Sequence, residues 1–391
     1  MSLPLDGVLV ADFSRVLAGP LAAATLADLG AEVIKVERPE VGDDTRHWGP
    51  PWTETPAGSS SSYFECANRS KKSVELDLAD PADLAVAREL AARCDVLIEN
   101  FRAGSLDRHG LGYDAVAARN PGVVYASITG FGSGGGADLA GYDFLVQAVG
   151  GLMSITGRPD EPTKAGVALV DVLTSKDAVV GILAALRARD RHAEGRGQRV
   201  EVNLLSSLLG SLANQASAYL TTGAAPVAMG NQHPSIAPYE TLRAKDGHVA
   251  VCCGNDGQFA RLVSAVGLPG LAADPRFVTN GDRVAHREDL VGLLENALAA
   301  DTVDTWVERL AGSGLPVGKV GSVADGFELA TRLGLEPTVD VGHGRARQVR
   351  SPLTFSATPV TTYTAPPGLG EHNDDVRTML SIPQDNQENP R

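Results

Sequence analysis

The chain has 391 residues, a length that favours two domains over a single core, and no targeting or membrane-spanning pattern, so we expect a cytoplasmic protein. Its formal net charge of −14 argues against a general nucleic-acid binder, whose surface would be basic, but local arginines could still bind an anionic ligand. The four cysteines show no zinc-ligand spacing, so we predict no metal site.

The first 130 residues alternate between strand-like and helix-like segments. Gly7 to Phe13 is a short apolar run, as expected of a strand buried on both faces, and a loop at Ser14 to Pro20 leads into a helix that runs through Ala31. Further strands are predicted at Glu32 to Glu37, Ser73 to Leu78, Asp95 to Ile98 and Val123 to Ile128, and a helix at Pro81 to Ala92. This alternation predicts an α/β fold with a large, doubly wound, mostly parallel sheet of the Rossmann-like kind.

The second half of the chain predicts a smaller unit and a return to the first one. A long helix follows Asp171, a strand is predicted at Val200 to Val202, and one low-charge helix is predicted from Asn203 to Leu220. The glycine- and serine-rich stretches Gly58 to Ser62 and Gly132 to Gly136 are predicted as loops. We therefore predict a large α/β domain over residues 1–222, a smaller α+β domain over 223–330, and a segment 331–391 that rejoins the large domain.

Polar or glycine residues follow several of the predicted strands. In parallel sheets, ligands bind beyond the carboxyl ends of the strands, so these positions mark the expected binding edge. They are Ser14 and Arg15, Arg38, Asn100 and Phe101, and Thr129 to Phe131. Arginine suits phosphate because its guanidinium donates parallel hydrogen bonds, yet Arg38 or Arg108 alone is more often a solvated surface charge. The residues by themselves predict an α/β protein with an anion-binding edge.

Asp171 directly follows the apolar run Val167 to Val170 and precedes a helical pattern. Aspartate is a favoured helix N-cap, which accounts for its position without any chemistry. A carboxylate at a strand end would also face the ligand edge, where the helix N-terminus favours its ionised form, and it could attack an activated acyl group. The local pattern leaves both interpretations open.

Several short motifs occur in a specific order along the chain. They are Val16 to Pro20 (VLAGP), Leu26 to Glu37 (LADLGAEVIKVE), Gly141-Tyr142-Asp143, Gly195 to Gln198 (GRGQ) and Gly370 to His372 (GEH). Each motif is weak alone. The ordered set resembles the class III CoA-transferase family, which includes formyl-CoA and carnitine CoA-transferases and also 2-methylacyl-CoA racemases.

The resemblance implies a role for each matching position. It makes Asp171 the nucleophile that passes through an aspartyl anhydride and an aspartyl-CoA thioester. The positions that would contact CoA are Val16, Leu17, Ala18, Arg38, Leu76, Asn100, Phe101, Arg102 and Arg108, with Tyr142 in the same site. The resemblance also implies an interlocked homodimer whose ligands are an acyl-CoA and a small carboxylic acid, with no tightly bound cofactor, no nucleic acid and no membrane.

Two positions separate the alternatives within and beyond this family. The racemases use a histidine where this chain has Tyr142, and a phenol, which ordinarily titrates near pH 10, is a poor base at neutral pH, so the transferase is favoured. Leu17 stands where formyl-CoA transferase has glutamine, which argues against formyl or oxalyl substrates. A non-catalytic CoA-binding protein, with Asn203 to Leu220 as an interaction face, is the third interpretation.

Overall fold

The chain forms two compact units. The computed structural model describes residues 2–55 and 58–381. Unit 1 combines the chain up to Leu152, Ala165–Gly223 and the residues from Glu336 onward, whereas unit 2 combines Met153–Lys164 and Ala224–Leu335. The chain therefore passes between the units four times. From the sequence we predicted domain limits at 222/223 and 330/331. Those limits remain a prediction, and the division into compact units is a separate description of the chain.

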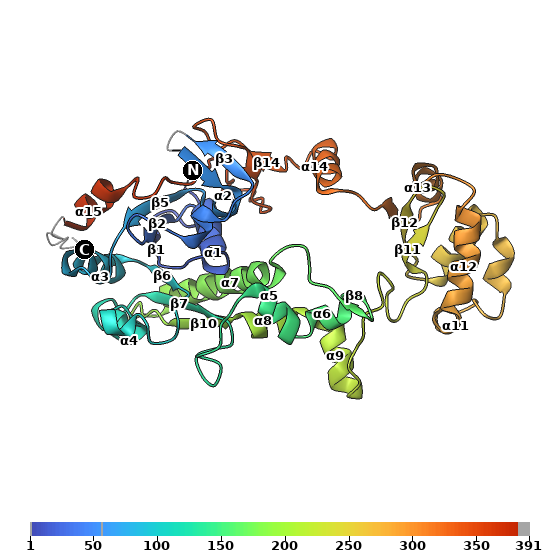
Figure 1. The fold of residues 1–391 in the computed structure, drawn as a ribbon, viewed down its shortest axis with the longest axis horizontal. Helices are drawn as coiled ribbons and strands as arrows, with labels where there is room; N and C mark the ends of the chain where they lie inside the picture. Colours follow the sequence, from blue (N-terminus) through green and yellow to red (C-terminus); the bar gives the residue numbers. More distant parts are fainter. Residues whose placement is uncertain (1, 56–57, 382–391) are drawn as a thin grey trace. The chain divides into compact units, whose positions relative to one another are not determined.

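Unit 1 is built on a sheet of six strands that all run parallel, in the order β10-β7-β6-β1-β2-β5 (Figure 1). The strands are β1 (Leu9–Asp12), β2 (Glu32–Glu37), β5 (Lys71–Glu75), β6 (Val96–Glu99), β7 (Val124–Thr129) and β10 (Arg199–Asn203). The predicted α/β class with a mostly parallel sheet is confirmed. From β1 the chain adds strands outward on one side and then, from β6, on the other, so the order reverses between β1 and β6.

Helices cover both faces of this sheet, and each face has its own core. One face packs against α1 (Ala18–Asp28), α7 (Leu169–Arg191) and α8 (Leu204–Ser211), the other against α3 (Pro81–Arg93), α4 (Tyr113–Arg119) and α15 (Asn373–Ser381). Successive strand residues point to opposite faces, so Val10 joins the first core and Ala11 the second. This double burial explains why the strands are continuous apolar runs rather than alternating ones.

The smaller elements of unit 1 differ from two of the predictions. Gly58 to Ser62, predicted as a loop, forms β4 (Gly58–Ser61), which pairs antiparallel with β3 (Trp52–Thr55), and then begins α2 (Ser62–Asn68). The single helix predicted from Asn203 to Leu220 is two helices, α8 and α9 (Ala213–Thr222). The right-handed path is interrupted at Ala213, the first residue of α9, whose φ is 45°. The other elements of unit 1 are η1 (Asp44–His47), η2 (Asp107–His109), α5 (Asp143–Val149), β14 (Thr338–Val339) and β15 (Gln348–Val349).

Unit 2 contains a three-stranded antiparallel sheet covered by helices. The sheet is formed by β11 (Tyr239–Arg243), β12 (His248–Cys252) and β13 (Val317–Lys319). The helices are α10 (Asp256–Ala265), η3 (Pro269–Ala273), α11 (Asn280–Ala285), α12 (Arg287–Leu298), α13 (Val303–Gly312) and α14 (Val323–Arg332), with a hairpin of β8 (Gly157–Arg158) and β9 (Glu161–Pro162). The short helix α6 (Leu152–Ile155) lies where the chain leaves unit 1. The core of unit 2 gathers Phe259, Leu290 and Trp306.

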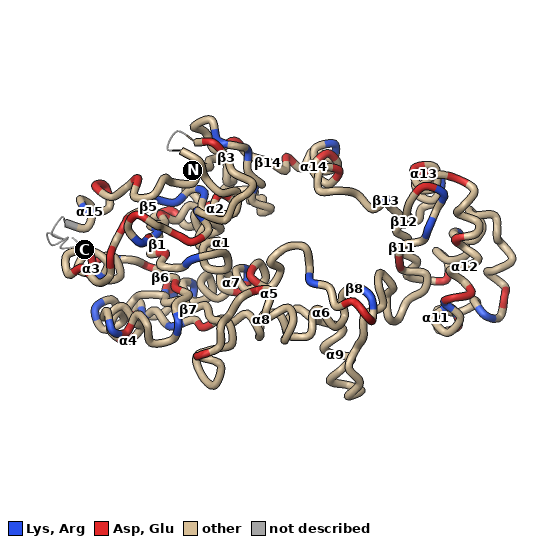
Figure 2. Tube along the Cα trace, in the orientation of Figure 1, with Lys and Arg blue, Asp and Glu red and all other residues tan. Residues whose placement is uncertain are grey.

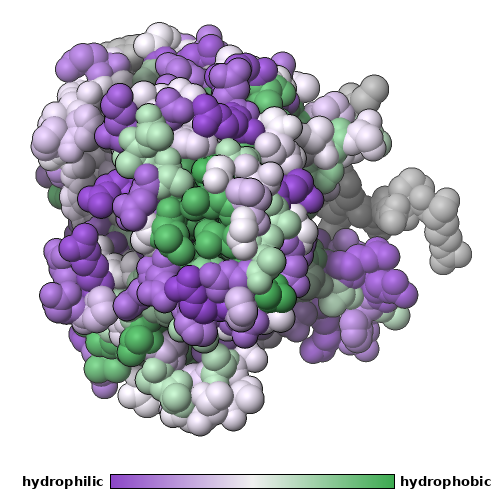
Figure 3. All heavy atoms as spheres, turned by 90° about the vertical axis from the view of Figure 1, so that its right-hand side faces the viewer, coloured by the Kyte–Doolittle hydropathy of each residue, from purple (hydrophilic) through white to green (hydrophobic). Residues whose placement is uncertain are grey.

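The surfaces carry both charges and apolar residues. Acidic and basic residues are interspersed along the trace of both units (Figure 2). The face in Figure 3 is largely hydrophilic around an apolar area. Val323 at the start of α14 is 81% exposed and Leu333, which follows its last residue, is 64% exposed, so other described residues leave these two apolar residues largely uncovered. No helix among the described residues is long and apolar enough to cross a membrane.

Candidate active site

A cavity of about 370 Å³ opens in unit 1 at the carboxyl ends of the parallel strands. Segments that follow β1, β6 and β7 supply most of its lining, which includes Arg15 to Ala18, Asn100 to Ala103 and Thr129-Gly130. The first two segments leave the strands between which the sheet order reverses. Loops diverge at such a point and leave a crevice, so the position of this cavity follows from the topology.

Most of the predicted site residues line this cavity, and three do not. The residues in the lining are Val16, Leu17, Ala18, Asn100, Phe101, Arg102, Tyr142 and Asp171. Arg38 lies outside the lining, where it forms an exposed ion pair with Asp44 at 2.6 Å. Arg108 donates to the carbonyl oxygen of Ser105, and the Leu76 side chain is buried in the second core of the sheet.

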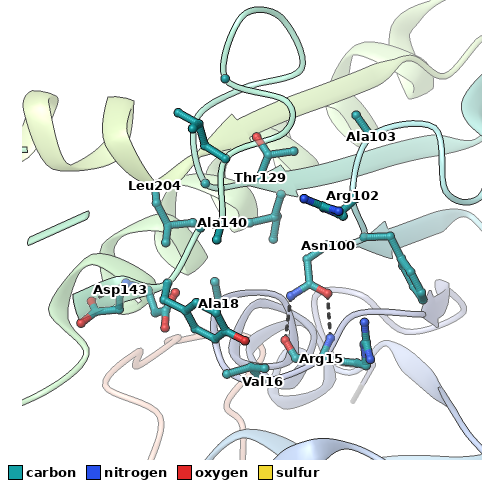
Figure 4. A pocket seen from close by; sticks show the side chains of 18 of the residues that line it. Arg15, Val16, Ala18, Asn100, Arg102, Ala103, Thr129, Ala140, Asp143 and Leu204 are labelled. Carbon is teal, nitrogen blue, oxygen red and sulfur yellow. Dashed lines mark hydrogen bonds between the residues drawn. The ribbon is translucent and has the colours of Figure 1, made fainter. Parts of the chain in front are cut away.

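One wall of the cavity is held by a reciprocal amide clamp. The side-chain oxygen of Asn100 accepts a hydrogen bond from the backbone N–H of Arg15 at 2.9 Å, and its amide nitrogen donates to the Arg15 carbonyl at 2.7 Å (Figure 4). The Arg15 guanidinium lies 5.1 Å from the centre of the Phe101 ring. The strand end at Asn100 therefore fixes the loop after β1, and Asn100 acts on the backbone of its neighbour.

Asp171 is the third residue of α7, within its first turn. The apolar run before it is not a strand, so the predicted strand-to-helix junction is wrong. The interpretation of Asp171 as the helix N-cap is wrong as well. The N-cap residue is Ala168, whose side chain forms no hydrogen bond to the helix. That role falls to Asp143, whose Oδ1 accepts from the N–H groups of Val170 at 2.8 Å and Asp171 at 3.3 Å.

The environment of Asp171 disfavours its negative charge. Burial, reinforced by the nearby Asp143 carboxylate, raises the pKa of Asp171 to about 7. The helix N-terminus, expected from the sequence to favour the ionised form, is outweighed by these two effects. Burial, with the charges of Asp171, Cys66 and Asp143, also raises the pKa of Tyr63 to about 12, so this phenol lies within electrostatic reach of Asp171 and stays protonated.

Two of these residues were missed in the sequence. Asp143 belongs to the Gly141-Tyr142-Asp143 motif, of which only the tyrosine was selected. We predicted no helix there, although Asp143 opens α5 in the structure, so the available signal was an aspartate in the motif next to Tyr142. Tyr63 follows a serine-rich stretch and carries no local signal for proximity to Asp171.

No group of three or more histidine, cysteine, aspartate or glutamate side chains could hold an ion in the described part of the chain. The positive charges at the cavity are Arg15 and Arg102, and Figure 4 shows both on the side away from Asp143. Asp44 also lines the cavity, with its carboxylate 3.7 Å from the Arg15 guanidinium, so the arginine side of the cavity carries both charges and an anionic ligand would have to compete with Asp44 for Arg15.

Comparison with known proteins identifies the family. The model of CoA-transferase family III matches residues 5–373. The chain belongs to CoA-transferase family III.

The similar family members cover nearly the whole chain. A succinate–glutarate CoA-transferase of Agrobacterium fabrum is 41% identical over 385 residues, which is 96% of each chain. An acetyl-CoA:oxalate CoA-transferase of Acetobacter aceti is 41% identical over 83% of each chain. A CAIB/BAIF family protein from Brucella suis has a similar crystal structure, with a TM-score of 0.88, 44% identity, and 97% of this chain and 100% of that one covered. The chain is a family III CoA-transferase, for which CoA or acyl-CoA is a substrate.

Proposed function

We propose that this enzyme moves CoA from an acyl-CoA donor to a carboxylate acceptor with Asp171 as the nucleophile. The observation that carries the proposal is a carboxylate on the cavity wall whose pKa is raised to about 7 by burial and by Asp143. A poorly hydrated carboxylate is a better nucleophile than a fully solvated one, and near neutral pH a large fraction is still ionised.

The proposed reaction passes through three covalent species on Asp171: an anhydride with the donor acyl group, an aspartyl-CoA thioester and an anhydride with the acceptor. The Asp171 carboxylate attacks the thioester carbonyl of the donor, and the C–S bond breaks, giving a mixed anhydride and CoA thiolate. The thiolate attacks the Asp171 acyl carbon and releases the donor carboxylate, which leaves an aspartyl-CoA thioester. The acceptor carboxylate attacks that thioester, and the C–S bond breaks, which forms a second anhydride and releases CoA thiolate. The thiolate then attacks the acceptor carbonyl, which yields the product acyl-CoA and regenerates Asp171.

The N-terminus of α1 is suited to stabilise the oxyanions of these steps. Leu17 is the N-cap residue of α1, and its side chain forms no capping hydrogen bond. Ala18 and Gly19 open the first turn of the helix. N–H groups in the first turn of a helix lack partners within the helix, and such groups stabilise negative charge on a reacting oxygen. Leu17 and Ala18 line the same cavity as Asp171.

We assign the recognition of the CoA phosphates to arginines. Arg15 and Arg102 line the cavity, and Arg38 and Arg108, which do not line it, remain proposed contacts. Guanidinium groups bind phosphate through parallel, charge-assisted hydrogen bonds. Arg38 would have to exchange its exposed partner Asp44 for a phosphate, which costs little because exposed ion pairs contribute about 0–1 kcal/mol.

Dicarboxylic acids are the proposed substrate class. The names of the two relatives described above include succinate, glutarate and oxalate, and each of these acids carries two carboxylates. The second relative is also named for acetyl-CoA, whose acyl group has no free carboxylate, so we propose that the acceptor acid of this enzyme carries a second carboxylate. Because Leu17 argues against oxalyl groups, succinate and glutarate are the proposed acceptors rather than oxalate. Racemase activity is not favoured, because no histidine lies among the described residues that line the cavity.

A homodimer is the proposed assembly. Apolar side chains are exposed on several helices of the chain, including Phe144 and Val149 on α5, Leu220 on α9 and Val323 on α14. Large exposed apolar areas mark interaction surfaces. We propose that a second copy of the chain covers these apolar side chains in the interlocked arrangement implied by the family resemblance. We also propose that the enzyme holds no tightly bound cofactor and works in the cytoplasm.

Replacement of the nucleophile tests this proposal. Asp171→Asn should lower CoA transfer from succinyl-CoA to glutarate at least about 1,000-fold while CoA still binds. Asp177→Asn is the matched control, because Asp177 lies exposed on the same helix, and it should keep wild-type activity. Hydroxylamine should trap the wild-type intermediate as a hydroxamate on Asp171, detected by peptide mass spectrometry. Wild-type transfer by Asp171→Asn would contradict the proposal.

A further inference from the structure

The loop that lines the cavity after β1 has an unusual backbone. Val16 has a φ of 71°, in the left-handed region that β-branched residues rarely adopt. Such a conformation persists only where the surroundings hold it in place. The loop also lies directly on α1, since a Cβ atom on Gly19 would come within 2.3 Å of the Ser14 side chain.

The backbone of this loop is held by side chains from other parts of unit 1. Ser14 donates its N–H to Asp12 at 3.0 Å, and its carbonyl accepts from the Lys35 ammonium at 3.0 Å. Asn100 holds both backbone groups of Arg15. The N–H of Val16 points at Asp43, 3.3 Å from each carboxylate oxygen. Five successive backbone groups therefore depend on four side chains rather than on secondary structure.

Lys35 and Asp43 are the centre of this support. Their charged groups lie 2.8 Å apart, and both side chains are fully buried. Asp43 also accepts from the N–H of Thr45 at 3.0 Å and from its hydroxyl at 2.8 Å. One ammonium thus anchors the carbonyl of Ser14, and its partner carboxylate anchors the N–H of Val16, two residues further along the loop.

Both groups keep their charges over the working pH range. Burial alone would raise the pKa of Asp43, but Lys35 and the hydrogen bonds from Thr45 hold it at about 2. Burial would lower the pKa of Lys35, but the surrounding carboxylates, Asp12 first, raise it above its usual value. The pair is therefore a permanent clamp rather than a pH switch.

We propose that the Lys35–Asp43 pair is a positioning device that holds the loop Ser14–Val16 in the shape that acyl transfer by Asp171 requires. The pair does not line the cavity and acts only through the loop. This inference rests on the proposed function. A burial penalty opposes every buried ion pair, and apolar residues of similar size often stabilise a fold equally well, so a purely structural role would not demand these charges.

The decisive variant replaces the pair without leaving a charge unpaired. Lys35→Met with Asp43→Leu should keep the fold, judged by circular dichroism and thermal unfolding, because both charges leave together. It should lower kcat about 100-fold through misplacement of the loop, while the Kd of CoA changes less than about 5-fold. A kcat within about 2-fold of wild type in the folded double variant overturns the proposal.

Rescue at Val16 distinguishes positioning from general stability. Glycine adopts positive φ without a steric penalty, so adding Val16→Gly to the double variant should restore part of the lost kcat, by about 5-fold or more. No gain from this third substitution contradicts the proposal. If the double variant does not fold, Asp43→Glu tests the proposal instead. This variant keeps the charge but moves the carboxylate away from the Val16 N–H, so kcat should fall. An unchanged kcat overturns the proposal.

A surface ion pair on the same strand supplies the control. Glu32 contacts Lys72 at 2.6 Å, with both side chains over 40% exposed, and Glu32→Gln should leave kcat within about 2-fold of wild type. The Asp171→Asn variant separates the two proposals. If that variant is inactive while the double variant has wild-type kcat, only the positioning role is wrong; if it is active, the proposed function is wrong.

Discussion

Asp143 accepts a hydrogen bond from the backbone N–H of Asp171 while its charge opposes ionisation of the Asp171 side chain. The same carboxylate therefore anchors the first turn of α7 and raises the pKa of the proposed nucleophile. Anchoring and tuning have different chemical requirements. An oxygen acceptor is enough to hold the helix, whereas the electrostatic effect needs a full negative charge.

The raised pKa predicts how activity depends on pH. Asp171 must be ionised to attack, and with a pKa of about 7 only about one tenth of the enzyme is active at pH 6. We expect kcat/KM to fall about 10-fold per pH unit below 7 and to level off above it. The measurement is kcat/KM from pH 5 to 9, with the Kd of CoA over the same range as a control for titration of the ligand. A kcat/KM profile that stays flat down to pH 5 would contradict a raised pKa of Asp171.

Replacement of Asp143 should separate anchoring from tuning. Asp143→Asn keeps an oxygen that can accept from the N–H groups of Val170 and Asp171, but it removes the negative charge. The acidic limb of the kcat/KM profile should then shift to lower pH by roughly half a unit to one unit. Asp177→Asn, which removes an exposed charge on the same helix, should leave the limb in place. A shift to higher pH in Asp143→Asn would contradict this account.

Unit 2 depends on a buried arginine, and its removal should cost stability. Arg283 is fully buried, donates to the carbonyls of Ala237 at 2.8 Å and Phe277 at 3.0 Å, and contacts Asp256 at 2.6 Å. Lysine keeps the charge but cannot make this fork of hydrogen bonds, so Arg283→Lys should lower the free energy of unfolding by about 2–4 kcal/mol.

Urea unfolding followed by circular dichroism measures this loss. The matched control is Arg309→Lys, because Arg309 makes a half-exposed ion pair with Asp301 and lies 4.4 Å from the Trp306 ring centre. That change should cost no more than about 0.5 kcal/mol. Equal losses of unfolding free energy in the two variants would show that the burial of Arg283 is not the source of its contribution to stability.

The sheet of unit 1 was predictable because its strands are buried on both faces. The strand predicted at Glu32 to Glu37 has those bounds in the structure, and the cavity lies at the predicted edge. The β3–β4 hairpin was missed because its serines and glycine resemble a loop in composition. The left-handed Val16 and its support were not predictable either. Lys35, Asp43 and Asn100 meet this loop across sequence separations of 21, 27 and 85 residues, which no local pattern reports.

The last helix of unit 1 has a consequence for synthesis on the ribosome. His372 and Asn373, at the start of α15, bond to the backbone of Ser73 and Glu75 in β5, the outermost strand on its side of the sheet. They are translated about 300 residues later, which takes roughly 15 to 60 s at common elongation rates. Until then the outer edge of β5 lacks these partners, and an uncovered edge strand is a template for pairing with other chains. The nascent chain therefore passes through a period in which chaperones that shield strand edges would be of most use to it.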